Sequence, residues 1–265
     1  MPASLYPNPP LVMVVLEIRH PRSEVSTPAH TFMKSVMSEY TPIERVETGV
    51  EFEIAQNGPP QSKPIMRRRL VSRDLHTSVS FQESAIVIET SHYKGWEWLR
   101  TLASAALTAR HEFAPLDGLE RIGLRYIDEI RVPFVDVDWA QWVSPDLIAP
   151  RVRESPLTMR LTQQQSVAQY QTDEPGYTFT LRYGVSRGAV VGSTEHLRRL
   201  QEPPTDGEFF LIDTDAAWTD PTGSVPVFDP AHVLEICDAL HAPIKMLFES
   251  LITKRLRNEV FFVEG

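Results

Sequence analysis

Two aspartates near the C-terminal third of the chain have a spacing that could support chemistry. Asp213 and Asp215 follow Leu211 and Ile212 in the stretch LIDTDAAW. We expect this stretch to end a strand, where alternate residues point to the same side. Two such carboxylates could bind a divalent cation, or act as an acid–base pair if burial separates their pKa values. They could also simply turn the chain and bond its backbone. We keep both as metal candidates and assign no metal.

Arginines form the second group with potential chemistry, and they lie on two predicted strands. In RIGLRYIDEIR, residues 121–131, alternation separates two sets of side chains. One face carries Ile122, Leu124, Tyr126 and Ile130, and the other carries Arg121, Arg125, Glu129 and Arg131. MRRRL adds three arginines at residues 67–69. Guanidinium groups bind carboxylates and phosphates through paired hydrogen bonds.

The same arginines could instead be neutralised within the protein. Nearby acids are Asp74, Glu83, Asp128 and Glu129. Cross-strand ion pairs with these acids would leave an ordinary solvated face. Trp96 is an added candidate, because it lies about 200° around the predicted helix from the inward Trp98. It would be an exposed interface anchor unless the 133–156 segment covers it. The predicted ligand- or partner-binding set is Arg121, Arg125, Tyr126, Arg131, Arg67, Arg69 and Trp96.

Familiar catalytic signatures are absent from the sequence. It contains no Gly-x-Ser-x-Gly elbow, no Walker loop, no Gly-x-Gly-x-x-Gly and no His-Glu-x-x-His. Cys237 is the single cysteine, which excludes an internal disulfide and a thiolate zinc site within one chain. We expect it to be buried and inert. The sequence therefore leaves open whether the protein is an enzyme, names no catalytic residue and predicts no cofactor.

Charge and hydropathy limit the classes of partner and the cellular compartment that we expect for this protein. The formal net charge of −9 disfavours general nucleic-acid binding, which depends on Lys and Arg releasing phosphate counterions. The N-terminal stretch has no basic region, and its apolar run at residues 11–16 is broken by Glu17 and Arg19. It is therefore typical of neither a signal peptide nor a membrane span. We predict a cytoplasmic protein without membrane contact.

Strand and helix patterns position these candidates. Strands are predicted at 11–19, 43–55, 65–73, 76–90 and 120–132, with a turn at residues 82–84. A first helix follows Thr27 as N-cap with Pro28 at its first position, and a second spans 95–113. Further strands are expected at 157–168, 176–186 and 207–214, with a helix or loop at 193–204. A closing helix starts after Asp229, and Pro243 should kink or split it.

Clustered strands followed by helices predict an α+β fold. We expect a curved antiparallel sheet packed on long amphipathic helices, arranged as one domain or as two similar β-then-helix halves. The predicted division is a half with two helices at 1–132, a connection at 133–156 that packs through Trp139 and Trp142, and a half ending in the long helix at 157–265.

Three stretches resemble a sporadically distributed bacterial protein family of uncharacterised function. They are PLVMVVLEIR at residues 10–19, RIGLRYIDEI at residues 121–130 and HAPIKMLFESLITKRLR at residues 241–257. The likeness spans about residues 8–258, and the Arg-x-Gly-Leu-Arg-Tyr segment is its most specific part. The resemblance implies Asn at the position where Asp128 stands. It implies a full-length bacterial protein and lends no catalytic residue.

Three functions remain open at this point. The first is a non-enzymatic binding or accessory protein that recognises a partner protein or a small anionic ligand. The second is an enzyme of unrecognised class that uses Asp213 and Asp215. The third is an RNA-binding or RNA-processing module that uses the arginine-bearing strands and would show one contiguous positive face. Homo-oligomerisation is also open.

Overall fold

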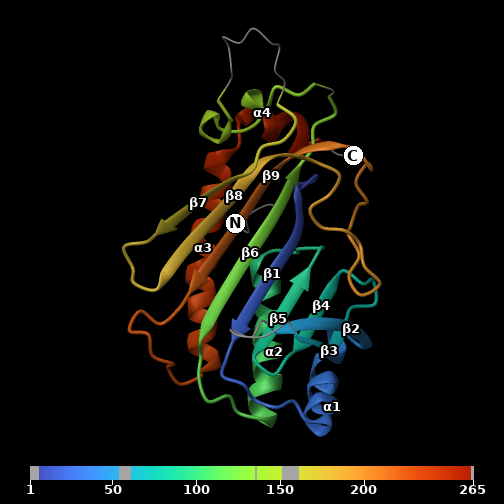
Figure 1. The fold of residues 1–265 in the computed structure, drawn as a ribbon, viewed down its shortest axis with the longest axis vertical. Coiled ribbons are helices and arrows are strands. Elements are labelled where there is room, and N and C mark those ends of the chain that lie inside the picture. The colour runs from blue at the N-terminus through green and yellow to red at the C-terminus, as the bar shows by residue number, and fades with distance from the viewer. Residues whose placement is uncertain (1–5, 54–60, 135, 151–160, 264–265) are drawn as a thin grey trace.

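Nine strands form one open antiparallel sheet in the computed structural model, which describes residues 6–53, 61–134, 136–150 and 161–263. The strands are β1 (Leu11–Arg19), β2 (Ile43–Glu53), β3 (Gln61–Val71), β4 (Thr77–Phe81), β5 (Ala85–Thr90), β6 (Arg121–Ile130), β7 (Ser166–Gln171), β8 (Tyr177–Arg187) and β9 (Glu208–Trp218). Their order across the sheet is β2-β3-β4-β5-β1-β6-β9-β8-β7 (Figure 1). The predicted α+β class with an antiparallel sheet is confirmed.

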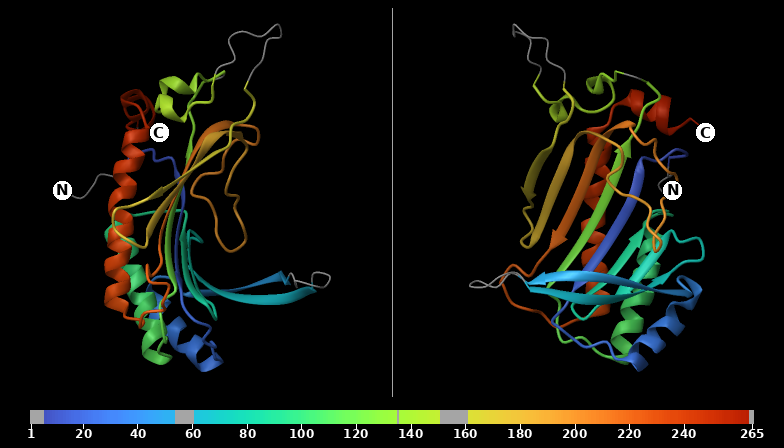
Figure 2. Two further views of the ribbon diagram at one scale, coloured as in Figure 1. Left: turned by 60° about the vertical axis from the view of Figure 1, so that its left-hand side comes forward. Right: turned by 45° about the vertical axis from the view of Figure 1, so that its right-hand side comes forward.

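Three helices cover one face of this sheet (Figure 2). They are α1 (Thr27–Val36), α2 (Trp96–Phe113) and α3 (Pro230–Leu251), and the short α4 (Lys254–Leu256) follows α3. Asp229 caps α3 as predicted, and its side chain accepts a hydrogen bond from the Ala231 amide. The predicted cap of α1 is wrong by one residue, because the Ser26 hydroxyl accepts the Ala29 amide. Pro243 does not split α3, which continues through it.

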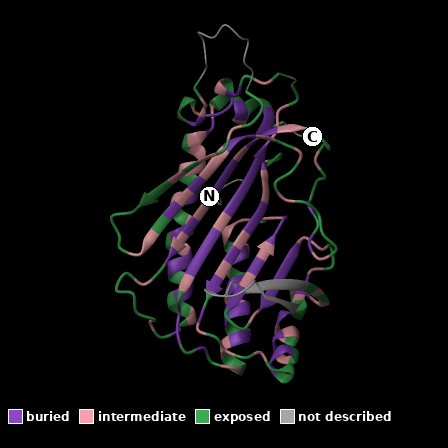
Figure 3. Cartoon of the chain, in the orientation of Figure 1, coloured by how far each residue is buried: buried purple, intermediate pink, exposed green. Residues whose placement is uncertain are grey.

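The main core lies between the sheet and these helices. The inward side chains of β6 follow the predicted alternation, since Ile122, Leu124 and Ile130 are fully buried and Tyr126 is nearly so. Figure 3 shows that the central strands are buried along much of their length. Helix α2 contributes buried residues at helical spacing, namely Leu99, Leu102, Ala103, Ala106 and Leu107. The apolar face of the strands and the apolar stripe of the helices pack on each other, because each element has a single apolar side to bury.

The opposite face of the sheet is only partly covered. The loop between β8 and β9 crosses it, and Leu197 of this loop packs on Met13 and Ile127. The 193–204 segment, expected to be a helix or a loop, belongs to this loop. The β2–β3 hairpin projects away from the body on the same side (Figure 2). The rest of this face displays the outward side chains of the central strands.

The sheet is continuous across the predicted 133–156 boundary, because β6 pairs with β1 on one side and with β9 on the other. Trp139 and Trp142 are buried, as expected for a connection packed on the body. The strand expected at 157–168 begins only at Ser166, and residues 157–160 lie outside the described part. Of the helices that can be described, none combines the length and the apolar character needed to cross a bilayer.

Candidate functional site

The arginine face consists of Arg121, Arg125 and Arg182 with the acids between them, on the side of the sheet away from the helices. Arg125 donates through Nε and Nη2 to the two carboxylate oxygens of Asp213, at 2.7 Å each. Asp213 is only 1% exposed, so the pair shields a buried charge. The hydrogen bonds from Arg125 to Asp213 raise the pKa of Arg125. Arg125 is therefore occupied by an internal partner.

The other charged groups of the arginine face also lie near opposite charges, although Arg182 Nη1 has no hydrogen-bond partner among the described residues. Arg121 lies 3.1 Å from Glu17 and 3.8 Å from Asp215, and Arg182 lies 3.8 Å from Asp215. Burial raises the pKa of Asp215, while Arg121 and Arg182 act in the opposite direction. Three arginines thus face three acids. This arrangement favours the salt-bridged interpretation of the strand over a vacant anion site.

The expected position of Asp213 and Asp215 at a strand end is wrong. Both lie in the middle of β9, which continues to Trp218, and pair with Ile127 and Arg125 of β6. The strand continues because neighbouring arginines compensate the carboxylates, so they need not turn the chain. Within the described ranges, no three or more His, Cys, Asp and Glu side chains gather closely enough to hold a metal ion.

The arginines of β3 lie apart from this network. Arg69 pairs with Glu47 at 2.7 Å and also with Glu89. Burial opposes the charge of Arg69, but the coulombic attraction of Glu89 and the hydrogen bond to Glu47 prevail and raise its pKa. Arg67 is exposed on the same strand. Of these two candidates, the structure thus places one in an internal ion-pair cluster and one in solvent.

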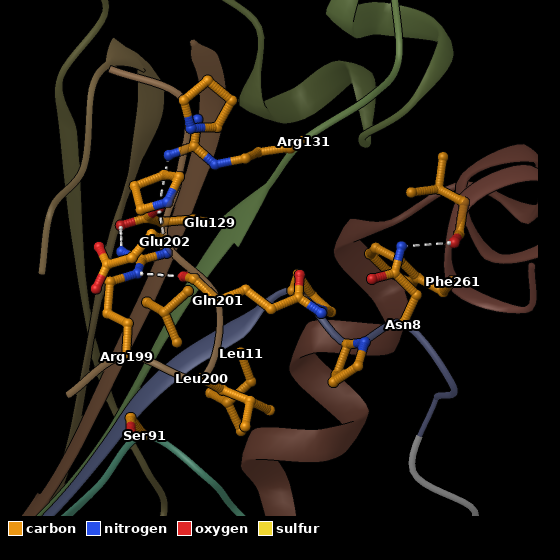
Figure 4. A pocket seen from close by; sticks show the side chains of 16 residues that line it. Asn8, Leu11, Ser91, Glu129, Arg131, Arg199, Leu200, Gln201, Glu202 and Phe261 are labelled. Carbon is orange, nitrogen blue, oxygen red and sulfur yellow. Dashed lines mark hydrogen bonds and ion pairs between the residues drawn. The ribbon is translucent and has the colours of Figure 1, made fainter. Parts of the chain in front are cut away.

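Arg131 belongs to a different site, the Glu129 pocket, a hollow of about 250 Å³. Glu129 accepts two hydrogen bonds from Arg199, at 2.7 and 2.9 Å, and one from Arg131 at 2.7 Å. The backbone amide of Val190 adds a fourth at 2.8 Å. Figure 4 shows Glu129 and Arg131, at the end of β6, converging with Arg199 of the β8–β9 loop. The prediction that Arg131 offers its charge to a ligand is not supported by this geometry, since the guanidinium also donates to the Gly188 and Gly207 carbonyls.

A larger cavity lies on the helix side of the sheet, and Trp96 and Tyr126 both line it. We call it the Asp128 cavity; its volume is about 520 Å³. Aromatic and apolar walls come from several elements: Tyr93, Trp96, Tyr126, Ile244 and Phe248. The floor is the sheet, with Leu11 of β1, Asp128 of β6 and Thr214 of β9. The two candidates that sequence analysis placed on separate elements are therefore brought together.

Trp96 is not a solvent-exposed anchor, because α3 lies against it. Its ring stacks on His241, with centroids 4.3 Å apart, and its Nε1 donates to Asp238 at 2.8 Å. None of the described residues of the 133–156 connection, the alternative cover, lines the cavity beside this ring. The position of α3 beside α2 explains the difference, since a helix that faces another helix buries positions outside its sheet-facing stripe.

A chain of hydrogen bonds orders the polar side of the cavity. The Tyr126 hydroxyl donates to the Tyr93 hydroxyl at 3.2 Å and lies 3.1 Å from His241 Nδ1. Because Tyr126 uses its proton toward Tyr93, we assign the donor at His241 to Nδ1–H. Burial lowers the pKa of His241 to about 4, so its ring is neutral at physiological pH. Burial also raises the pKa of Tyr93 to about 12.

Asp128 is the polar group that this network does not satisfy. The residue is 7% exposed, and no other described side chain or backbone group hydrogen-bonds or ion-pairs with its carboxyl. Burial, with a smaller contribution from the charge of Asp213, raises the pKa of Asp128 to about 8. The expectation that Asp128 is one of the acids neutralising the arginines is wrong, because it points to the helix side.

Sequence reasoning overlooked Asp128, His241 and Tyr93 as site residues. The signal for Asp128 was present, since strict alternation from Ile122 through Tyr126 places residue 128 on the inward face. A charged side chain on an inward face without a partner is unusual enough to indicate a functional position. No comparable signal existed for His241, whose role depends on how α3 packs.

Comparisons with known proteins do not add to this geometry. A scan against protein-family models finds no match, and searches of curated proteins and of solved structures find none either. The likeness to a bacterial family therefore stays a prediction from the three stretches quoted above.

Proposed function

We propose that this protein is a binding protein that holds a small organic molecule in the Asp128 cavity, and that it acts by binding rather than by catalysis. One observation carries the proposal: a cavity of about 520 Å³ has on its floor a buried carboxyl that has no partner among the described residues. Small-molecule sites typically have this size, apolar and aromatic walls, and a few polar groups that orient the ligand.

The arginine face gives less support to the other functions. An anion would compete with Asp213 for Arg125, and the acids that alternate with the arginines would repel it. RNA binding has the same difficulty, because a contiguous positive face is interrupted by Glu17, Asp213 and Asp215. Catalysis by Asp213 and Asp215 would require carboxylates that are not already paired with arginines.

We also propose that two β-then-helix halves form this site together, with the division placed before β6 and not at the predicted 133–156 connection. In each half the first strand, β1 or β6, lies at the centre of the sheet, and the later strands run inward from an edge. Each run of strands is followed by a long helix, α2 or α3. The cavity has walls from both helices, so it lies where two similar β-then-helix halves would meet, a common place for ligand sites.

A cavity-filling substitution tests the proposed function. Thr214→Phe places a ring on the floor of the cavity, and Thr178→Phe makes the same change at an exposed position of β8 on the opposite face. Native mass spectrometry of gently purified protein would follow any ligand bound in the wild type and both variants. Binding of a neutral fluorescent dye that brightens in apolar surroundings would be titrated in parallel.

We expect the wild type and Thr178→Phe to retain the bound mass or the dye, and Thr214→Phe to lose both while keeping a wild-type circular dichroism spectrum. Equal binding by Thr214→Phe and Thr178→Phe would contradict the cavity as the site. The same spectra report the subunit number, and so test the prediction of a homo-oligomer.

A further inference from the structure

The ligand's charge can be inferred from the groups that line the Asp128 cavity. Asp128 lies between Leu11 of β1 and Ile212 of β9 in the sheet, so its strand neighbours offer it no polar side chain. Diagonally across, Thr214 supplies a hydroxyl on the same face. Burial of an ionised carboxyl without a partner costs desolvation free energy. A ligand that supplies an opposite charge offsets this cost.

No cation of the described protein serves as that partner. Lys94 and Lys245 line the cavity, but neither forms an ion pair with Asp128 in the described structure, and the Lys94 ammonium lies over the Trp98 ring at 5.4 Å. His241 is neutral because burial lowers its pKa to about 4. The carboxyl on the floor is thus left for a group that the ligand supplies.

The walls of the cavity also favour a cation. Tyr93, Trp96, Tyr126 and Phe248 present aromatic rings to the same space. Ring faces attract ammonium groups, and the attraction is largest where water is excluded. An anion would meet these rings together with the carboxyl of Asp128, and the two lining lysines, Lys94 and Lys245, are offset in number by the lining acids Glu97 and Glu249. The chemistry of floor and walls is therefore opposite to that of the anion site predicted from the sequence.

We propose that the Asp128 cavity binds an organic amine, whose ammonium group pairs with the Asp128 carboxylate while its apolar body lies among the aromatic walls. This inference rests on the proposed function and adds the ligand's chemical class. No covalent step is involved. Where the carboxyl is protonated before binding, its proton passes to the buffer as the ammonium enters.

Other titratable groups could also exchange protons on binding, so the design must separate them from Asp128. Those that line the cavity or act on Asp128 come from the N-terminal segment, the β5–α2 loop, α2, α3, β6 and β9: Tyr6, Tyr93, Lys94, Glu97, Tyr126, Asp213, His241, Lys245 and Glu249. Asp128→Asn removes only the floor carboxyl and keeps its shape. Asp215→Asn is the matched control, because it makes the same change on the opposite face of the same sheet region.

Three probes of similar shape and different charge test the inference: phenethylamine, phenethyl alcohol and hydrocinnamate. Isothermal calorimetry with the full chain would measure their affinities for the wild type and both variants. At pH 6.5, two buffers of different ionisation enthalpy would give the number of protons released. At a pH above the Asp128 pKa of about 8, where the carboxyl is ionised and the probe is still an ammonium, we expect the wild type and Asp215→Asn to bind the amine about tenfold or more tighter than the alcohol.

We further expect about one proton to be released when the amine binds at pH 6.5, from the Asp128 carboxyl. Asp128→Asn should bind amine and alcohol about equally and release no proton. An amine preference that survives in Asp128→Asn, or tightest binding of hydrocinnamate, would overturn the inference. Equal binding of alcohol and amine by the wild type would overturn it while leaving the proposed function standing. Binding of none of the three probes would count against both.

Discussion

Asp128 and Glu129 are neighbours in the chain and belong to the same residue class, yet their surroundings are opposite. Glu129 faces the side of the β8–β9 loop and accepts hydrogen bonds from two arginines and a backbone amide. Asp128 faces the helix side and has no partner among the described residues. Burial alone would raise the pKa of Glu129, but its arginine partners outweigh it and hold that pKa below its usual value. For Asp128, unopposed burial raises the pKa to about 8.

This contrast distinguishes charged groups that are paired within the protein from a charged group that is left for a ligand. The Glu129 pocket contains two arginines, as an anion site often does. Their guanidinium groups, however, pair with Glu129 and bond the β8–β9 loop, so they hold this loop on the sheet (Figure 4). The Asp128 cavity has no arginine in its lining, and its floor carboxyl has no partner among the described residues. A count of arginines would choose the Glu129 pocket, whereas the search for a buried polar group without a partner chooses the Asp128 cavity.

The largest expected effect comes from removing the charge of Glu129. Glu129→Gln leaves the buried Arg199 and the half-buried Arg131 without their shared counter-charge, so the free energy of unfolding should fall by about 3–5 kcal/mol. Urea denaturation at neutral pH would measure the loss. Glu202→Gln, at an exposed position of the same pocket, is the control and should change stability by less than about 0.5 kcal/mol. Similar losses in the two variants would show that Glu129 does not fasten the loop.

Asp128→Asn should have the opposite sign. The folded-state pKa of about 8 lies above the usual value of 3.8, so the folded state binds the proton more tightly and the wild type loses stability as pH rises through this window. The variant lacks this loss. Its stability advantage should grow by about 1.4 kcal/mol per pH unit between about pH 5 and 7. Urea titrations at both pH values would check it, and a gap that does not change with pH would contradict an unpartnered Asp128.

The Arg125–Asp213 pair, on the face of the sheet away from the helices, provides a second test of whether a charged group is paired within the protein. In a double-mutant cycle with Arg125→Met and Asp213→Asn, the coupling energy should be about 1–2 kcal/mol, because the hydrogen bonds reach a buried carboxylate from a guanidinium that is partly in solvent. Denaturant unfolding of the four proteins would give the coupling. A value near zero would mean that Arg125 is free to bind a ligand.

Arg121→Gln should have the smallest effect. Its side chain is partly exposed, and its contact with Asp215 is long at 3.8 Å. We expect less than about 1 kcal/mol of destabilisation, which diminishes further in high salt because exposed pairs are screened. Thermal unfolding at low and high salt would measure it. A loss of bound ligand mass in this folded variant would move the binding site to the arginine face.

Much of the fold followed from local patterns. Alternation separated the two faces of residues 121–130, and helical spacing located α2 and the start of α3 close to their observed bounds. Errors arose where a boundary depends on distant neighbours. The strand at 207–214 was expected to end before it does, since the carboxylates of β9 are neutralised by β6 and β8, which are remote in sequence.

Which side chains of β6 face the core follows from the sequence alone, because the pleat of a strand places residues 126, 128 and 130 on one side whatever surrounds them. The sequence also determined which residue types were available for chemistry. Which of them are matched depends on the tertiary fold: Arg125 pairs with Asp213, 88 residues away in the chain, whereas Asp128 has no partner among the described residues. The physical reason is that ion pairing depends on distances between strands and helices, and those follow from the order of the sheet and the packing of α2 and α3.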